Sequence, residues 1–99
     1  MKRGGCVYII TNNHHNVLYT GVTSNLKGRI WDHRSKQYPA SFTAKYNCRK
    51  LVYYEFYSTI REAIAFEKSI KASNRNYKER LISTMNPTWR DLWEDVEKW

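Results

Sequence analysis

Residues 6–11, Cys-Val-Tyr-Ile-Ile-Thr, and residues 17–20, Val-Leu-Tyr-Thr, decide the fold of this chain. Both runs consist mainly of β-branched and aromatic residues, which β-strands favour. Residues 12–16 between them, Asn-Asn-His-His-Asn, have the chemistry of a turn. The sequence therefore predicts an N-terminal β-hairpin. Gly21 would close it, because its backbone freedom allows the chain a sharp exit.

A helix and a third strand follow the hairpin in the predicted order. Thr23 or Ser24 can cap a helix that runs to about residue 35, with an apolar inner face. Residues 36–49 are basic and irregular, with aromatic residues among the lysines. Residues 51–57, Leu-Val-Tyr-Tyr-Glu-Phe-Tyr, form the clearest strand in the chain.

Three helices are predicted in the rest of the chain. Residues 59–62, Thr-Ile-Arg-Glu, match a capping box and open a helix to about residue 73. A shorter helix, capped within residues 76–79, ends near Thr84, and Asn86-Pro87 separates it from a last helix at about residues 88–97, capped by Thr88. The predicted order is β-β-α-β-α-α-α. This order indicates an α/β (α+β) fold with a small antiparallel sheet flanked by helices.

The size and composition of the chain indicate one globular domain. With 99 residues and 41% hydrophobic residues, residues 1–99 are expected to form a single core. The last helix either packs on the body through its tryptophans or lies at the periphery. We expect no membrane-spanning segment and a cytoplasmic location. Cys6 and Cys48 lack the spacing of a zinc or disulfide framework, so we expect them to be buried thiols.

The charge of the chain favours a polyanionic partner. The net charge is +8, and residues 1–90 alone carry 16 basic and 5 acidic residues, a net charge of +11. A basic body of this size attracts nucleic acid at long range. Solubility is the alternative explanation, so charge makes nucleic acid only a favoured partner.

Glu67 is the most informative carboxylate. On a helical wheel it falls inside the apolar face that Ala63 and Ile70 define. A buried carboxylate is costly unless a cation or a metal ion accompanies it. The position therefore predicts either a metal ligand or a salt bridge at the edge of the core.

Two further pairs carry groups that phosphate chemistry uses. Arg29 and His33 lie one helical turn apart, at the edge of the buried stripe of their helix. Arginine suits phosphate oxygens, and histidine titrates near neutral pH. Tyr8 and Tyr19 lie in adjacent strands, where cross-strand side chains meet. Either pair alone has a structural explanation, so only the four residues together indicate phosphate chemistry.

These residues fall into a recognisable pattern. Cys6-Val7-Tyr8, then Leu18-Tyr19-Thr20-Gly21 and then Gly28-Arg29 resemble the signature of GIY-YIG nucleases. Tyr19 follows Tyr8 by eleven positions, and Arg29 follows Gly21 by eight. The resemblance covers nearly the whole chain. The chain is similar to the short single-domain bacterial subgroup related to the excinuclease nuclease domain, with Cys6 and Thr20 in place of a motif glycine and isoleucine.

The resemblance implies a three-stranded antiparallel sheet and a role for each residue. Glu67 would hold a single divalent ion, Mg²⁺ or Mn²⁺. Tyr8 would accept a proton from the attacking water with help from His33, and Tyr19 would position that water or a phosphate oxygen. Arg29 would stabilise charge on the scissile phosphate. Gly21, Thr23 and Asn86 are the expected supporting residues.

The expected function is a metal-dependent endonuclease that hydrolyses phosphodiester bonds in DNA, at branched, nicked or damaged sites or in repair. The alternative is a catalytically silent nucleic-acid-binding module that uses the same basic face. RNA stays open as a substrate, as does a protein partner that supplies specificity. The residues expected to contact nucleic acid are all basic: Lys27, Arg34, Lys36, Lys45, Arg49 and Lys71.

Overall fold

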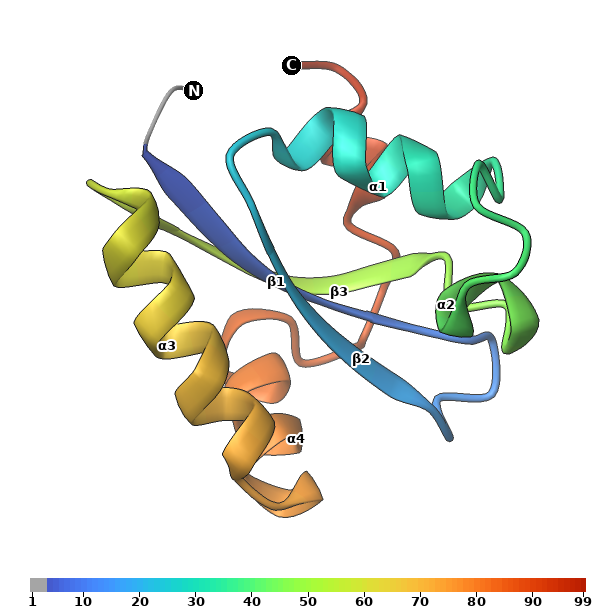
Figure 1. Cartoon of the computed structure of the whole chain (residues 1–99). Coiled ribbons are helices and arrows are strands. Elements are labelled where there is room, and N and C mark those ends of the chain that lie inside the picture. Colours follow the sequence, from blue (N-terminus) through green and yellow to red (C-terminus); the bar gives the residue numbers. More distant parts are fainter. Residues whose placement is uncertain (1–3) are drawn as a thin grey trace.

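The computed structural model describes residues 4–99 (Figure 1). Three strands and five helices follow one another along these residues. In chain order they are β1 (Gly5–Thr11), β2 (Leu18–Thr23), α1 (Leu26–Arg34), α2 (Phe42–Lys45), β3 (Lys50–Tyr57), α3 (Ile60–Ala72), α4 (Arg75–Met85) and α5 (Trp93–Val96).

The three strands form one antiparallel sheet, as the family resemblance implied, and their order in the sheet is β2-β1-β3. The central strand β1 is buried along its whole length, because β2 and β3 pair with its edges and helices cover both faces. This explains why its sequence is continuously apolar and does not alternate. The two faces of β1 carry different side chains, with Tyr8 and Ile10 on one and Val7 and Ile9 on the other.

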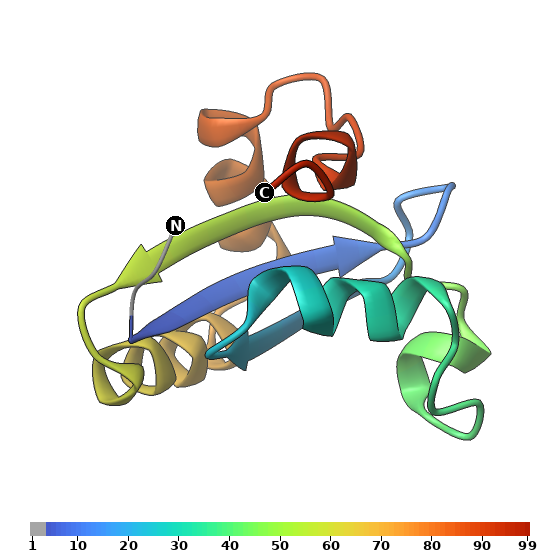
Figure 2. The same ribbon diagram turned by 90° about the horizontal axis from the view of Figure 1, so that it is seen from above.

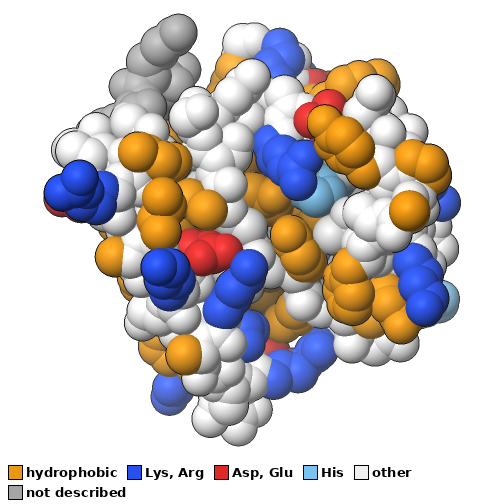
Figure 3. Space-filling view, in the orientation of Figure 1, with side chains coloured by type: hydrophobic (Ala, Val, Ile, Leu, Met, Phe, Trp, Pro, Cys, Tyr) orange, Lys and Arg blue, Asp and Glu red, His pale blue; other side chains and the backbone are white. Residues whose placement is uncertain are grey.

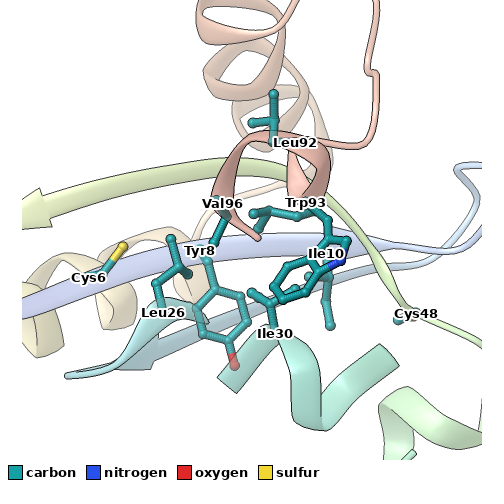
Figure 4. Packing of buried hydrophobic residues seen from close by; sticks show 10 residues of the cluster. Cys6, Tyr8, Ile10, Leu26, Ile30, Cys48, Leu92, Trp93 and Val96 are labelled. Carbon is teal, nitrogen blue, oxygen red and sulfur yellow. The ribbon is translucent and has the colours of Figure 1, made fainter. Parts of the chain in front are cut away.

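Each face of the sheet has its own hydrophobic core. On the Tyr8 face, Leu26 and Ile30 of α1 pack with Trp93 and Val96 of α5 (Figure 4). In Figure 4 the hydroxyl of Tyr8 points away from Trp93 and Val96, out of the apolar cluster. On the opposite face, α3 and α4 contribute the residues Ala63, Ile70 and Ile82. Figure 2 shows that α4 and α5 lie beside β3, which leaves β2 at the other edge of the sheet.

The predicted hairpin, α1, β3 and α3 are present, but several boundaries differ. Asn25, not Thr23 or Ser24, caps α1, and its side chain accepts the N–H of Gly28. The capping box of α3 is confirmed, since Thr59 and Glu62 exchange both hydrogen bonds. The helix α4 begins at Arg75 under an Asn74 cap, earlier than expected. Sequence patterns therefore predict that a helix is present more reliably than they predict its first residue. Several neighbouring Asn, Ser or Thr residues can each serve as the N-cap, which shifts the start by a few residues.

Two expectations for the irregular regions were wrong. Residues 36–49 contain a one-turn helix, α2, capped by Ser41, so the observed order is β-β-α-α-β-α-α-α. The last helix is Trp93–Val96, shorter than residues 88–97, and Thr88 does not cap it. Trp89 lies outside that helix with a positive φ of 54°. The buried Leu92 and Trp93 hold this segment on the sheet, which local sequence signals do not show.

Both cysteines are buried free thiols, as expected. Burial raises the pKa of Cys6 to about 12, which keeps the thiol protonated and unreactive. Within residues 4–99, none of the helices has the length and apolar character needed to cross a bilayer.

Candidate active site

Tyr8 lies against Gly21, its partner on the neighbouring strand β2. A Cβ atom built on Gly21 would overlap the hydroxyl and the ring of Tyr8. The backbone of Gly21 has no positive φ, and the residue lies within β2. The expectation that Gly21 ends the hairpin for its backbone freedom was therefore wrong. Its role in the fold is to leave room for the Tyr8 side chain.

A chain of hydrogen bonds runs from Tyr8 through α1 to the segment before β3. The Tyr8 hydroxyl lies 2.9 Å from Nε2 of His33. The other ring nitrogen, Nδ1, lies 2.9 Å from Oγ1 of Thr43, which in turn lies 3.3 Å from Oγ of Ser41. Tyr8, His33 and Thr43 are all buried. A neutral imidazole has one donor and one acceptor nitrogen, so it can pass a proton from one side of the chain to the other.

Burial keeps Tyr8 and His33 uncharged at neutral pH. It raises the pKa of the Tyr8 hydroxyl to about 12, against the opposing effect of the Arg29 charge. Burial and, to a smaller extent, the positive charge of Arg29 lower the pKa of His33 to about 4. At pH 7 the pair is therefore a phenol beside a neutral imidazole, whose unprotonated ring nitrogen can accept a proton.

Tyr19 and Arg29 line a hollow of about 120 Å³ beside His33. The Tyr19 ring lies 5.8 Å from the His33 ring and 6.2 Å from the Phe42 ring. The Arg29 guanidinium is 3.8 Å from the Asp32 carboxylate and lies 5.7 Å from the centre of the Tyr38 ring. Its side chain is 35% exposed, so it can reach an anion in the hollow. Four predicted residues, Tyr8, Tyr19, Arg29 and His33, therefore meet at one place.

Glu67 approaches this cluster from α3. It is 8% exposed although it is a carboxylate, and its Oε2 lies 2.8 Å from the ammonium of Lys71, one turn further along the helix. The Lys71 ammonium also lies 5.8 Å from the centre of the Tyr19 ring, which connects Glu67 to the cluster. The hydrogen bond to Glu67 raises the pKa of Lys71. In Figure 3, basic side chains lie beside acidic surface on the face that contains α1 and α3.

Near the cluster, Glu67 is the carboxylate that could hold a magnesium-type ion, so the protein would supply one ligand. Among the described residues, three His, Cys, Asp or Glu side chains do not gather anywhere in the arrangement that a metal ion needs. A single carboxylate matches Mg²⁺ or Mn²⁺ sites that are completed by water and substrate phosphate, because these ions often take one or two protein carboxylates. Glu67 is compatible with such a site, provided that Lys71 leaves its carboxylate.

The basic residues expected to bind nucleic acid have varied surroundings. Lys36 lines the hollow and donates to Asn47. Lys45 lies over the Tyr46 ring, and Arg49 is exposed. Two others are occupied in holding the fold. Lys27 donates to the carbonyl of Trp99, and Arg34 donates to Asp91 and to the carbonyl of Arg49.

The three expected supporting residues serve the fold. Gly21 makes space for Tyr8, as described above. The Thr23 hydroxyl accepts the N–H of Asn25 at the start of α1. The buried amide of Asn86 donates to the carbonyls of Val52 and Arg90 and accepts the N–H of Arg90. Asn86 thus fixes the end of α4 to β3, and among the described residues no hydrogen bond joins it to the Tyr8–His33 cluster.

The sequence reasoning missed Ser41 and Thr43. They lie in the stretch taken as irregular, and no periodic pattern marks them. The only available signal was the pattern Ser-x-x-Ala at residues 41–44, since Ser41 caps α2 by accepting the N–H of Ala44. That short helix turns Thr43 inward to His33.

Comparison with known proteins agrees with this geometry. Residues 4–92 match the model of the GIY-YIG catalytic domain, so the chain belongs to the GIY-YIG family. This family membership implies a nuclease fold and a nucleic-acid substrate.

Among individual proteins, the chain is similar to several bacterial UPF0213 proteins. It is 45% identical over 67 residues to one from Clostridium perfringens, a match that covers 68% of this chain and 71% of the relative. It is 37% identical over 76 residues to one from Staphylococcus haemolyticus, covering 77% and 90% of the two chains. The solution structure of a UPF0213 protein from Bacillus halodurans superposes with a TM-score of 0.56 at 28% identity, over 88% of this chain and 90% of that one.

Proposed function

We propose that this protein is a metal-dependent endonuclease that hydrolyses phosphodiester bonds in DNA. Tyr19, Arg29 and His33 line one hollow, and Tyr8 is joined to it by its hydrogen bond to His33. This convergence of residues from three elements carries the proposal. Glu67 adds a buried carboxylate near this cluster, because its partner Lys71 lies 5.8 Å from the centre of the Tyr19 ring. A module that only binds nucleic acid has no need for a carboxylate in its groove, since a carboxylate repels phosphate.

The proton chemistry follows from the pKa values of Tyr8 and His33. The water oxygen attacks phosphorus as one water proton passes to the Tyr8 oxygen. The Tyr8 proton passes at the same time to Nε2 of His33, which is neutral at pH 7. Because free phenolate is disfavoured at a pKa of about 12, a concerted transfer avoids forming it. For Nε2 to accept this proton, Nδ1 must carry the hydrogen of the neutral ring, and the Thr43 hydroxyl oxygen 2.9 Å away would accept it and hold this tautomer.

Charge on the scissile phosphate is stabilised by Arg29, whose partly exposed guanidinium faces the hollow. The Tyr19 hydroxyl orients the attacking water or a phosphate oxygen. A divalent ion at Glu67 would act as a Lewis acid on the leaving oxygen. The phosphorus–oxygen bond to the leaving oxygen breaks, and each binding event cuts one strand, because residues 4–99 contain one such cluster.

The substrate that we propose is DNA with a branch, a nick or damage, in a repair-related role like that of the excinuclease nuclease domain. The chain would act in the cytoplasm, with a partner protein supplying target choice. RNA cleavage is an outcome that the experiment distinguishes. Lys36, Lys45 and Arg49 lie near the hollow or in the segment around α2, where a phosphate backbone would pass.

A second candidate function is a silent nucleic-acid-binding module. The ion pair between Glu67 and Lys71 favours it, because the carboxylate is neutralised within the chain. The two proposals differ in turnover. In the silent module, the same basic face binds nucleic acid and no bond is cut.

The test is cleavage of labelled plasmid, single-stranded, nicked and branched DNA and of RNA, with Mg²⁺ or Mn²⁺ compared with EDTA. We expect metal-dependent cleavage of at least one DNA substrate. Binding across the panel by folded protein, without cleavage in either metal, would contradict the nuclease and favour the silent module.

A further inference from the structure

Lys71 is bound to one carboxylate oxygen of Glu67, the residue proposed to hold a divalent ion. Its ammonium lies 2.8 Å from Oε2 of Glu67. The carboxylate side chain is 10% exposed, so few directions of approach from solvent remain. Two cations at one carboxylate repel each other strongly in a partly buried site. A divalent ion and Lys71 therefore exclude each other at Glu67.

The exposure of Lys71 makes the exchange feasible. Its side chain is 52% exposed, in contrast to that of Glu67, so its ammonium can leave without disturbing the core. The ammonium also lies 5.8 Å from the centre of the Tyr19 ring, and Tyr19 lines the hollow with Arg29. A displaced Lys71 can therefore move towards a phosphate group in that hollow.

We propose that Lys71 is a positioning residue that acts as the resident counterion of Glu67 and yields the carboxylate to a divalent ion. This inference rests on the proposed function, because it assumes the metal site at Glu67. In the metal-free protein, Lys71 neutralises the buried carboxylate and holds it in place. When the ion binds, Lys71 becomes a second cation beside Arg29 for the substrate phosphate.

The measurable consequence is competition. Removing the charge of Lys71 should strengthen divalent-ion binding, because the ion no longer displaces a partner. An ion pair with one exposed partner contributes modestly, so Lys71→Gln should tighten Mn²⁺ binding by about threefold to tenfold. Lys71→Arg should bind Mn²⁺ no more tightly than the wild type, since a planar guanidinium holds a carboxylate with two parallel hydrogen bonds.

Lys68 provides the matched control. It lies on the same helix beside Glu67, is exposed, and within residues 4–99 forms no ion pair. Lys68→Gln removes the same charge from the same region. Its effect on Mn²⁺ affinity should stay below about twofold, since exposed charges are screened by salt.

The experiment measures Mn²⁺ binding to the nucleic-acid-free protein by calorimetry and by the spectrum of free Mn²⁺, for wild type, Lys71→Gln, Lys71→Arg, Lys68→Gln and Glu67→Gln. Thermal unfolding with and without Mn²⁺ gives a second readout. Lys71→Gln should lose stability without metal and gain more from Mn²⁺ than the wild type. This combination separates an exchange role from a merely structural one.

The two possible failures are distinguishable. Equal Mn²⁺ affinity of Lys71→Gln, Lys68→Gln and wild type, with binding lost in Glu67→Gln, would overturn the role of Lys71 alone. Mn²⁺ binding that Glu67→Gln leaves unchanged, or no binding by any variant, would overturn the metal site and with it the proposed function.

Discussion

The Tyr8 hydroxyl and Nε2 of His33 lie 2.9 Å apart, and this contact joins the central strand of the sheet to the first helix. Both groups are buried, and both are neutral at pH 7 for the same reason, which is the loss of hydration. The acid–base machinery of the proposed reaction is thus assembled before any substrate arrives.

The burial of His33 predicts a pH dependence of stability. The pKa of His33 falls from 6.5 to about 4 on folding, so between these values the unfolded chain binds a proton that the folded chain does not. The free energy of unfolding should therefore be highest above pH 6.5 and fall as the pH drops towards 4, by up to about 3 kcal/mol from this group.

Urea denaturation of the wild type and of His33→Gln at about pH 7 and about pH 4.5 measures this contribution. The wild type should lose more stability between the two conditions than the variant, since glutamine does not titrate. Equal losses would show that His33 is not responsible.

The contact between Gly21 and Tyr8 predicts that Gly21→Ala damages both stability and activity. The added methyl group overlaps the Tyr8 ring and hydroxyl, so the strand pair must shift. Overpacking of this kind costs about 1–3 kcal/mol. The same substitution in a Tyr8→Phe background should cost less, because the hydroxyl overlap is gone. If urea denaturation gave the same loss of free energy for Gly21→Ala in both backgrounds, the result would contradict the proposed contact.

Asn86 should prove structural. Its buried side chain makes three hydrogen bonds, a buried one to the carbonyl of Val52 and two partly buried ones to the backbone of Arg90. Asn86→Ala should lower the free energy of unfolding by about 2–3 kcal/mol, because buried backbone groups lose their partners. At a temperature where the variant is folded, its single-turnover cleavage rate should match the wild type. A large loss of rate in folded protein would instead place Asn86 in the site.

Arg29→Ala should reduce turnover more than binding, because Arg29 faces the hollow where charge develops. We expect a loss of about 100-fold or more in the single-turnover rate, with binding in EDTA weakened by less than about tenfold. Arg80→Ala, which removes an exposed arginine of α4 that does not line the hollow, should affect both only slightly. Equal losses in rate and binding for Arg29→Ala would make Arg29 a docking residue.

Local patterns were sufficient to predict the hairpin, α1, α3 and the burial of Glu67. The position of Glu67 on the helical wheel predicted that its side chain is buried, and it is 8% exposed. The wheel left open whether a salt bridge or a metal ion accompanies the carboxylate, and the structure shows a salt bridge to Lys71. Thr43 could not be predicted, since it reaches His33 only because Ser41 starts a one-turn helix in a stretch without periodicity. The position of α5 also depends on tertiary packing, as Leu92 donates its N–H to the carbonyl of Leu51.

The role of Gly21 could likewise not be predicted from local sequence patterns. Its position after the predicted second strand suggested a sharp exit from the hairpin, and only the cross-strand register shows that Tyr8 is its neighbour. Long-range pairing of this kind is not encoded in any one segment.

The most direct test of the central claim is the single-turnover cleavage rate of the preferred DNA with Mn²⁺, compared between Glu67→Gln and Glu79→Gln. Glu79 is the matched control, because it also forms a helical ion pair at i,i+4 spacing, with Arg75, away from the hollow. The account predicts a loss of about 1,000-fold for Glu67→Gln and a near wild-type rate for Glu79→Gln, with both variants folded. Undiminished metal-dependent cleavage by Glu67→Gln would contradict it.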